Sequence, residues 1–302
     1  MKEPEALLSE CGLCPRNCGV NRLKGELGFC RAGDTVKVAQ ASLHHWEEPC
    51  ISGRRGSGTV FFSNCNLRCV FCQNHSISQQ GEGNEIGVAR LSRIFLELQA
   101  KGAHNINLVT PTPYVPQIIT ALRESRQKGL RLPVVYNTGA YENVETIKML
   151  GEYIDVYLPD LKYFGDGYAL RYSGAEGYFA AASAAVREMV AQRGEARFDR
   201  EKTLVQGVII RHLMLPGLLF DSKKVVDFVH NSFGDSVYLS LMNQYIPLHR
   251  AGSYPEINKP LNQGHYRGMI RYCLEIGVKN AFVQGQGTDS EDFVPPFNLE
   301  GV

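Results

Sequence analysis

From residue 56 onward, short runs of β-branched and aromatic residues alternate with amphipathic stretches. This alternation is typical of βα units built on a mainly parallel sheet. The runs predict six strands, at residues 59–63, 106–110, 133–136, 154–158, 208–213 and 237–241, and a candidate seventh at 281–284.

The amphipathic stretches predict helices between these strands. In the first of them, Val88, Leu91 and Leu98 fall on one helical face. Further helices are predicted from residue 115 to 128 and at residues 143–150, 178–192, 222–230 and 264–276. Because crossovers between parallel strands are right-handed, strands and helices in this order all wind the same way. We therefore expect an α/β fold, an open or partial (β/α)6 barrel of the TIM type.

Residues 1–55 do not share this rhythm. They are rich in cysteine, glycine and short turns, and only the first few residues fit a helix. We expect them to form a small metal-binding lobe, since a bound metal can organise such a segment. The predicted division is therefore a Cys-rich N-terminal lobe at 1–55 and a barrel at 56–302.

Charge and hydropathy limit which partners and which cellular compartment are expected for this chain. Lys and Arg total 32 and Asp and Glu total 31, a formal net charge of +1, so the basic surface of a nucleic-acid-binding protein is not expected. The longest apolar stretch, residues 208–220, is interrupted by Arg211 and His212, and the N-terminal ten residues carry three glutamates and no apolar signal segment. We expect a cytoplasmic protein that binds neither nucleic acid nor a membrane.

Cysteines are concentrated in the first quarter of the chain. Nine are present, an odd number, and eight of them precede residue 73. Without a secretion signal, this distribution favours metal chemistry over disulfides. Cys65, Cys69 and Cys72 form a C-x3-C-x2-C motif directly after the first predicted strand. Three thiolates on one short loop can hold three irons of a cubane cluster and leave the fourth iron open to a substrate or cofactor.

This motif resembles the signature of the radical S-adenosylmethionine (SAM) superfamily, C-x3-C-x-aromatic-C, with Phe71 as the aromatic residue. The stretch GSGTVFFSNCNLRCVFCQN, with CGLCPRNCGV and GELGFC upstream, resembles the PflX-type homologues of the pyruvate formate-lyase activating enzyme. The resemblance covers nearly the whole chain. It implies a 4Fe–4S cluster on Cys65, Cys69 and Cys72 and SAM on the fourth iron. It also implies reductive cleavage of SAM to a 5′-deoxyadenosyl radical, which abstracts hydrogen from a substrate.

The same resemblance implies SAM contacts beside the cluster and at the end of the second strand. Beside the cluster it points to Phe71 and to Asn74, two residues past the last cysteine. After the second strand, Thr110 and Thr112 stand where the family often has a Gly-Gly-Glu-type turn for the SAM amino group. No carboxylate is present here, and a plain Pro-rich loop is the alternative.

Later strand ends extend the implied site. Asn137 and Thr138 resemble part of an Asp-Thr-Asn-Gly segment, and Asp160 and Lys162 an Asp-Leu-Lys segment, which line SAM and a monovalent cation in the activating enzyme. Asn137 replaces an aspartate, which weakens the case for the cation, and a solvated Asp–Lys pair is the alternative. His212 matches a family position near SAM, although a histidine in an apolar strand also fits a satisfied core residue.

The N-terminal lobe holds a candidate second metal site. Its four cysteines, Cys11, Cys14, Cys18 and Cys30, supply enough thiolates to close a metal site completely. A zinc site, an iron site and a second iron–sulfur cluster all fit, and we favour iron. The following segment, residues 44–53, reads as a lid or docking edge or as a strand that packs the lobe on the barrel. It includes Cys50, which we leave unassigned, whereas Cys273 reads as a buried hydrophobic residue.

These features lead to three hypotheses on function. The first is a radical SAM oxidoreductase that activates a glycyl-radical enzyme, a protein partner, by abstracting hydrogen from a glycine, with flavodoxin or ferredoxin as electron donor. The second applies the same chemistry to a small metabolite or a peptide. The third is a non-catalytic metal-binding or electron-transfer protein. Only the resemblance favours the first, because fold and cofactor do not name a substrate.

Overall fold

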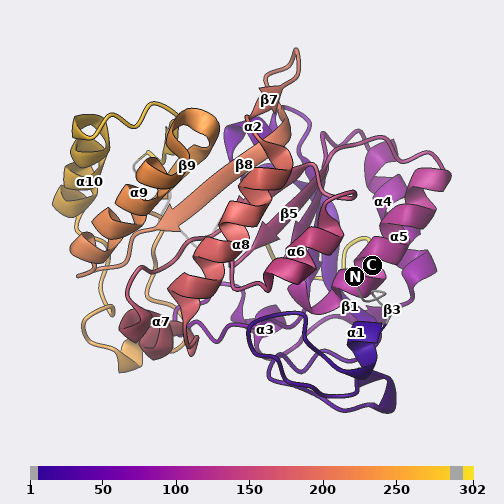
Figure 1. The fold of residues 1–302 in the computed structure, drawn as a ribbon. Helices are drawn as coiled ribbons and strands as arrows, with labels where there is room; N and C mark the ends of the chain where they lie inside the picture. Colours follow the sequence, from indigo (N-terminus) through magenta and orange to yellow (C-terminus); the bar gives the residue numbers. More distant parts are fainter. Residues whose placement is uncertain (1–5, 286–294) are drawn as a thin grey trace.

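A computed structural model describes residues 6–285 and 295–302 and consists of a curved, mostly parallel sheet covered by helices (Figure 1). Seven parallel strands follow the order β10-β9-β8-β6-β5-β4-β2. They are β2 (Ser57–Phe62), β4 (Ile106–Val109), β5 (Val134–Thr138), β6 (Val156–Pro159), β8 (Leu204–Leu213), β9 (Tyr238–Met242) and β10 (Ala281–Val283). All seven predicted strands are present.

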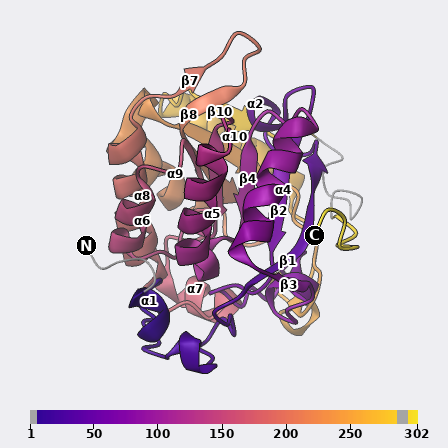
Figure 2. The same ribbon diagram turned by 90° about the vertical axis from the view of Figure 1, so that its right-hand side faces the viewer.

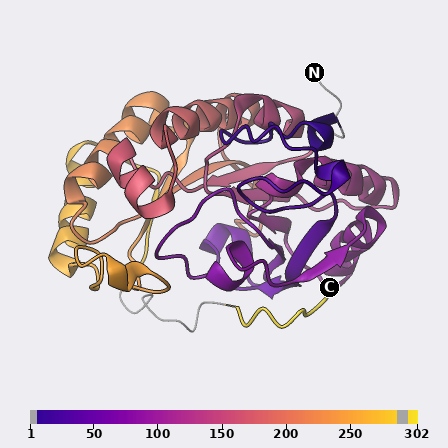
Figure 3. The same cartoon turned by 90° about the horizontal axis from the view of Figure 1, so that it is seen from below.

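Apart from α7 (Asp166–Ser173), which lies at the carboxyl ends of the strands (Figure 1), the longer helices lie in an arc around the outer face of this sheet (Figure 3). They are α4 (Val88–Ala100), α5 (Val115–Gln127), α6 (Val144–Leu150), α8 (Tyr178–Arg193), α9 (Leu219–Phe233) and α10 (Gln263–Glu275). These six were predicted, and α7 was not. The ends of the strand order, β10 and β3, are not paired with each other, so the sheet is not closed. The predicted α/β fold with a partial TIM-type barrel is therefore confirmed.

Three strands lie outside the predicted pattern. β1 (Val36–His44) runs antiparallel to β2 and also pairs with β3 (Asn84–Ile86). The two-residue strand β7 (Arg197–Phe198) pairs with β8. β1 belongs to the segment that was expected to form the lobe, yet its residues Val38, Ala39 and Ala41 are buried in the same sheet as the barrel strands. The division of the chain at residue 55 stays a prediction.

The two ends of the parallel strands differ. At the amino ends, the short helix α2 (Pro49–Ser52) packs Cys50 and Ile51 against Val135, Val156 and Ile209. At the carboxyl ends lie α3 (His75–Ser78), α7 and residues 6–30, along the lower edge in Figure 1. Figure 2 shows α7 and the start of the described chain at the same edge. The carboxyl ends are where α/β barrels carry their functional groups.

None of the helices in the described part of the chain has the length and apolar character that a bilayer crossing needs. Cys273 is buried in α10, as expected of a small hydrophobic residue.

Candidate active site

The three-cysteine loop, residues 63–74, begins with a sharp turn at the end of β2. Asn64 has a left-handed backbone with φ 69°, a conformation that asparagine tolerates better than most residues. Its backbone N–H donates to the Ile77 carbonyl at 2.8 Å, and its side-chain amide donates to the Tyr114 hydroxyl at 2.8 Å. These bonds turn the chain away from the strand and fix where the loop starts.

The middle of the loop is held by α7. The backbone N–H groups of Arg68 and Val70 donate to the carbonyls of Ser173 and Tyr172, at 3.0 and 2.8 Å. The Gln79 side chain donates to the Cys69 carbonyl at 2.9 Å. A loop with few backbone groups left to solvent is held in one geometry by its neighbours, which is what a metal site requires of its ligands.

Each of the three sulfur atoms has a polar neighbour. The Leu67 N–H lies 3.4 Å from Cys65 Sγ, the Ser173 hydroxyl 3.0 Å from Cys69 Sγ, and the Ser78 hydroxyl 3.3 Å from Cys72 Sγ. Such contacts are typical of thiolates that bind iron.

Burial makes the isolated loop a poor place for charge. It raises the pKa of the Cys65 thiol well above its usual range and that of Cys72 to about 11. Cys65 and Cys72 are therefore neutral when no metal is bound, and a metal that binds their sulfur atoms displaces the protons. Three half-buried cysteines on one rigid loop, each with a polar neighbour at its sulfur atom, therefore fit an iron–sulfur cluster.

Lys162 places a cation beside the three cysteines. Its ammonium acts electrostatically on Cys65 and Cys72, and Cys69 in turn acts on it. Burial alone would lower the pKa of Lys162, but Asp160, with an oxygen 2.7 Å from Nζ, and Cys69 raise it above its usual value. The lysine is therefore charged at neutral pH.

Asp160 also joins Lys162 to a second cation, Arg211. Arg211 Nε lies 2.7 Å from the Asp160 carboxylate, and its other nitrogens bond Asn137 Oδ1 at 2.6 Å and Glu47 Oε2 at 3.0 Å. Burial opposes the charge on Asp160, but Arg211 and Lys162 outweigh it and hold the pKa of this carboxyl below its usual value. Asn137 and Asp160 are thus brought together by Arg211, and as contacts of SAM or a cation they stay predictions.

Glu47 and its neighbour Glu48 come from the segment at residues 44–53. Glu48 lies 3.9 Å from Arg211, and burial raises the pKa of its carboxyl to about 7. The segment therefore connects β1 to α2, and its two carboxylates lie next to Arg211. Cys50 packs within the inner core at the amino ends of the strands, away from the loop. Sequence reasoning missed Glu47, although paired acidic residues before a proline were visible.

Thr112 and Thr138 meet at a buried carboxyl that was also missed. Both hydroxyls donate to Glu142 Oε1, the Thr112 bond at 2.5 Å, and the Tyr136 hydroxyl is 3.4 Å away. Burial raises the pKa of Glu142 to about 7, although the hydroxyl bonds work in the opposite direction. The carboxyl that the family-type turn lacks near Thr112 is thus present in space, contributed by the loop after β5.

The remaining residues predicted to contact SAM lie on several different elements. Thr110, with a left-handed φ of 59°, closes β4, where strain in a β-branched residue calls for a local reason. Phe71 is buried against Tyr245, and the Asn74 backbone is hydrogen-bonded to the Cys72 sulfur. His212 Nδ1–H donates to the Leu161 carbonyl at 2.8 Å, and the buried Nε2 lacks a partner within the described residues. As SAM contacts these residues stay predictions.

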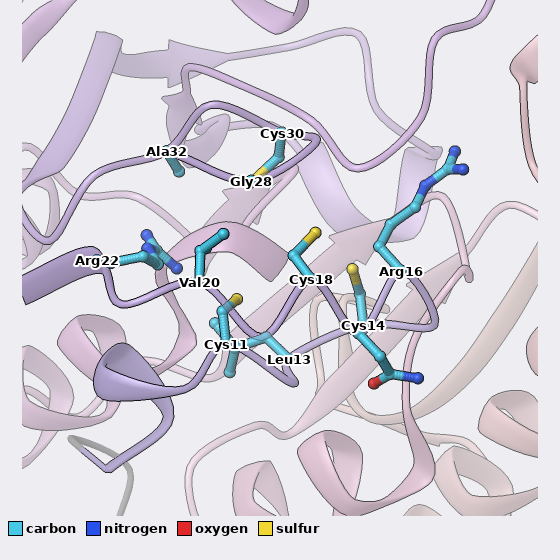
Figure 4. Close-up of a pocket in the computed structure, with 11 residues that line it drawn as sticks. Cys11, Leu13, Cys14, Arg16, Cys18, Val20, Arg22, Gly28, Cys30 and Ala32 are labelled. Carbon is cyan, nitrogen blue, oxygen red and sulfur yellow. The ribbon is translucent and has the colours of Figure 1, made fainter. Parts of the chain in front are cut away.

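The four N-terminal cysteines also come together. Cys11, Cys14, Cys18 and Cys30 line one small cavity, the four-cysteine pocket (Figure 4). Among the described residues, no three His, Cys, Asp or Glu side chains converge closely enough to hold a single metal ion. Neither group of cysteines is therefore arranged as a single-ion centre.

Comparisons with known proteins agree with this geometry. The family model for the radical SAM superfamily matches residues 59–229, which contain the three-cysteine loop and the strand ends around it. The chain belongs to the radical SAM superfamily. Members of this superfamily use a 4Fe–4S cluster and SAM, so the chain is an enzyme of that class, whereas the PflX-type subgroup is not established by the match.

Individual radical SAM relatives add the following. The uncharacterized protein MJ0674 of Methanocaldococcus jannaschii is 30% identical over 281 residues, covering 90% of this chain and 75% of its own. The structure of Streptococcus suis SuiB bound to S-adenosylmethionine has a TM-score of 0.51 at 15% identity, covering 74% of this chain and 49% of that chain. The maturase HydG of Carboxydothermus hydrogenoformans gives 0.50 at 11% identity, covering 78% of this chain and 56% of that chain. The chain thus spans about half the length of these structures, which share its fold.

Proposed function

We propose that Cys65, Cys69 and Cys72 hold a 4Fe–4S cluster and that SAM binds its open iron with its carboxylate on Lys162. The observation that carries this proposal is the charged ammonium of Lys162, which is paired with Asp160 at 2.7 Å and acts electrostatically on the cysteines of the loop. An electron-transfer cluster needs no such cation next to an unfilled ligand position. When bound and reduced, the cluster and SAM supply a 5′-deoxyadenosyl radical.

The residues of the chain bind and orient SAM in this proposal. Lys162 exchanges part of its ion pair with Asp160 for the SAM carboxylate, and Arg211 keeps Asp160 compensated at 2.7 Å. Thr110 and Thr112 lie at the next strand end, and His212 offers the unpartnered Nε2 as a further contact. Asn137, Thr138 and Asp160 remain candidate oxygen ligands for a monovalent cation.

For the substrate, we propose a glycine of a partner protein, a glycyl-radical enzyme. The radical takes one Cα hydrogen atom, which leaves a glycyl radical and 5′-deoxyadenosine. Support comes from the resemblance of residues 56–74 to activating enzymes. A protein of this fold, SuiB, has been solved with a precursor peptide bound. A flavodoxin or ferredoxin is the proposed electron donor.

The test has two stages. The anaerobically reconstituted, dithionite-reduced protein is first assayed for release of 5′-deoxyadenosine from SAM. It is then mixed with candidate glycyl-radical enzymes, and the doublet of a glycyl radical is sought by electron paramagnetic resonance (EPR). SAM cleavage with a glycyl radical supports the whole proposal. Cleavage stimulated only by a small metabolite or a peptide replaces the protein partner, and a loaded, reducible cluster that cleaves no SAM under any of these conditions contradicts it.

A further inference from the structure

The four-cysteine pocket is a second place where thiols gather, and radical chemistry at the first site does not require it. Its cavity measures about 20 Å³. Besides the four cysteines it is lined by the apolar residues Leu13, Val20 and Ala32 and by Arg16, Asn17, Arg22 and Gly28. Figure 4 shows the four sulfur atoms around a common space, three from one tight turn and Cys30 from the segment that crosses it. Residues 19 positions apart are therefore brought to one point.

The backbone around the pocket is built to bring the sulfur atoms close. The Cys11 N–H donates to the Val20 carbonyl and the Gly19 N–H to the Cys11 carbonyl, each at 3.0 Å, which closes the turn. A Cβ at Gly28 would lie 2.9 Å from Cys18 Sγ, so the crossing segment can approach only because it carries a glycine here.

Backbone amides also point at the sulfur atoms. The Phe29 N–H lies 3.4 Å from Cys18 Sγ, and the backbone amides of Arg16 and Ala32 are hydrogen-bonded to Cys14 and Cys30. Amide N–H groups aimed at sulfur stabilise a thiolate rather than a thiol. Free thiols in an apolar cavity would make little use of these donors.

Two arginines complete the electrostatics. The Arg16 guanidinium stacks on the Phe29 ring at 3.6 Å, and Arg22 is buried with bonds to the carbonyls of Gly33 and Pro113. Arg22 acts electrostatically on Cys30. The positive charge of Arg22 near Cys30 favours a centre that is net negative, as a metal centre with four thiolates is.

Four thiols fit more than one kind of metal centre. A zinc or iron ion draws four thiolates onto one atom, and no such convergence exists among the described residues. A cubane cluster binds each thiolate to a different iron, so its ligands surround a wider space. We propose that the four-cysteine pocket holds a second iron–sulfur cluster, with a protein thiolate on every iron and no open position.

This second cluster would lie next to the first. The side chain of Asn66 is hydrogen-bonded to Cys14 and has its Oδ1 3.9 Å from Cys65 Sγ. Arg16 donates to the Asn66 carbonyl at 3.1 Å, and Arg68 of the loop donates to the Phe29 carbonyl at 2.7 Å. One residue thus bridges the two groups of cysteines, which is close enough for two reduced clusters to couple magnetically.

The experiment removes the first site and leaves the pocket intact. The full-length variant Cys65→Ala/Cys69→Ala/Cys72→Ala is reconstituted anaerobically with iron and sulfide, and metal, sulfide and EPR spectra are measured. We expect about four irons and four sulfides per chain, because the remaining four thiolates suffice for one cubane. After reduction, SAM should leave the EPR signal unchanged, since no iron is open. This readout is independent of catalysis and of whether the proposed function holds.

The matched experiment removes the pocket from the otherwise native protein. Cys14→Ala/Cys30→Ala should lower the iron content from about eight to about four per chain, keep a SAM-sensitive EPR signal and remove the broadening from coupling. Cys273→Ala is the control and should retain about eight irons. A triple loop variant that is folded by circular dichroism and binds one zinc, or no metal, overturns the proposal. If the Cys14→Ala/Cys30→Ala variant fails to fold, the triple variant still decides.

Discussion

The three-cysteine loop and the four-cysteine pocket are joined by the side chain of Asn66, which contacts both Cys14 and Cys65. The two sites differ in the groups that face their sulfur atoms. In the loop, serine hydroxyls and a charged lysine accompany three thiols at the carboxyl ends of the strands. In the pocket, four thiols are surrounded by backbone amides, apolar side chains and the arginines Arg16 and Arg22. Metal sites with a missing protein ligand are reactive and those with a full set are structural or carry electrons. The chain thus combines an open and a closed arrangement within one small region.

The largest effect is expected when a cysteine of the three-cysteine loop is removed and the four-cysteine pocket is left intact. Cys69→Ala should abolish release of 5′-deoxyadenosine from SAM, because two thiolates do not hold a cubane at the open position. Anaerobic assays with reduced, reconstituted protein measure this. Cys50→Ala is the control, since Cys50 lies in the inner core at the opposite ends of the strands, and it should retain SAM cleavage. Cleavage by Cys69→Ala at the wild-type rate would contradict the assignment of the loop.

The loop and the barrel were predictable because their signals are local. Periodic apolar runs identify strands such as β4 and β5, and three cysteines within eight residues define a ligand set without knowledge of the fold. β1 was missed because its nine residues mix apolar and polar side chains, and its partner β2 lies beyond the turn and α2.

The polar network could not be derived in this way. Glu47 and Arg211 are 164 residues apart and meet only because the sheet curls around the segment that follows β1. Strand alternation indicated that Arg211 and His212 face opposite sides, but not which of them faces Asp160. Glu142 carried a usable signal, a carboxylate four residues after Thr138 in a strand-end loop.

The next effect concerns Glu142, which lies between the two regions and acts on Cys14. Its pKa of about 7 in the folded chain exceeds the ordinary 4.5, so the folded state binds more protons between these values. Stability is therefore fully present below about pH 4.5 and falls as the pH rises through 7. The shift corresponds to a loss of about 3 kcal/mol.

Glu142→Gln removes this titration and keeps an oxygen for the threonine hydroxyls. Urea unfolding of the two proteins at pH 5 and pH 8 should show that the wild type loses about 3 kcal/mol more than the variant. Other titrating groups cancel in this difference. The exposed Glu145→Gln should show the wild-type dependence. Parallel stability curves for wild type and Glu142→Gln would mean that the carboxyl is ionised throughout.

A smaller effect is expected when the charge of Lys162, next to the three-cysteine loop, is removed. Lys162→Met removes a charge-assisted bond to the SAM carboxylate, worth about 2 kcal/mol, and should weaken SAM binding about 30-fold. Arg211 continues to pair with Asp160, so the fold is expected to survive. Equilibrium binding of SAM to the reconstituted cluster, followed by EPR, measures the change. Lys148→Met, an exposed site, is the control. Unchanged affinity in Lys162→Met would remove the observation on which the proposed function rests.

The smallest expected effect concerns the hydroxyl between Tyr163 and Cys69. Ser173 Oγ lies 2.8 Å from the Tyr163 hydroxyl and 3.0 Å from Cys69 Sγ. A thiolate carries no proton, so in the loaded protein Tyr163 donates to Ser173 and Ser173 donates to Cys69. Ser173→Ala should cost about 1 kcal/mol of stability and make the potential of the loop cluster more negative, because the lost bond favours the more negatively charged reduced state. Redox titration followed by EPR tests this against the exposed control Ser183→Ala. A shift confined to the SAM-insensitive signal would place the hydroxyl at the wrong cluster and break the distinction between the two sites.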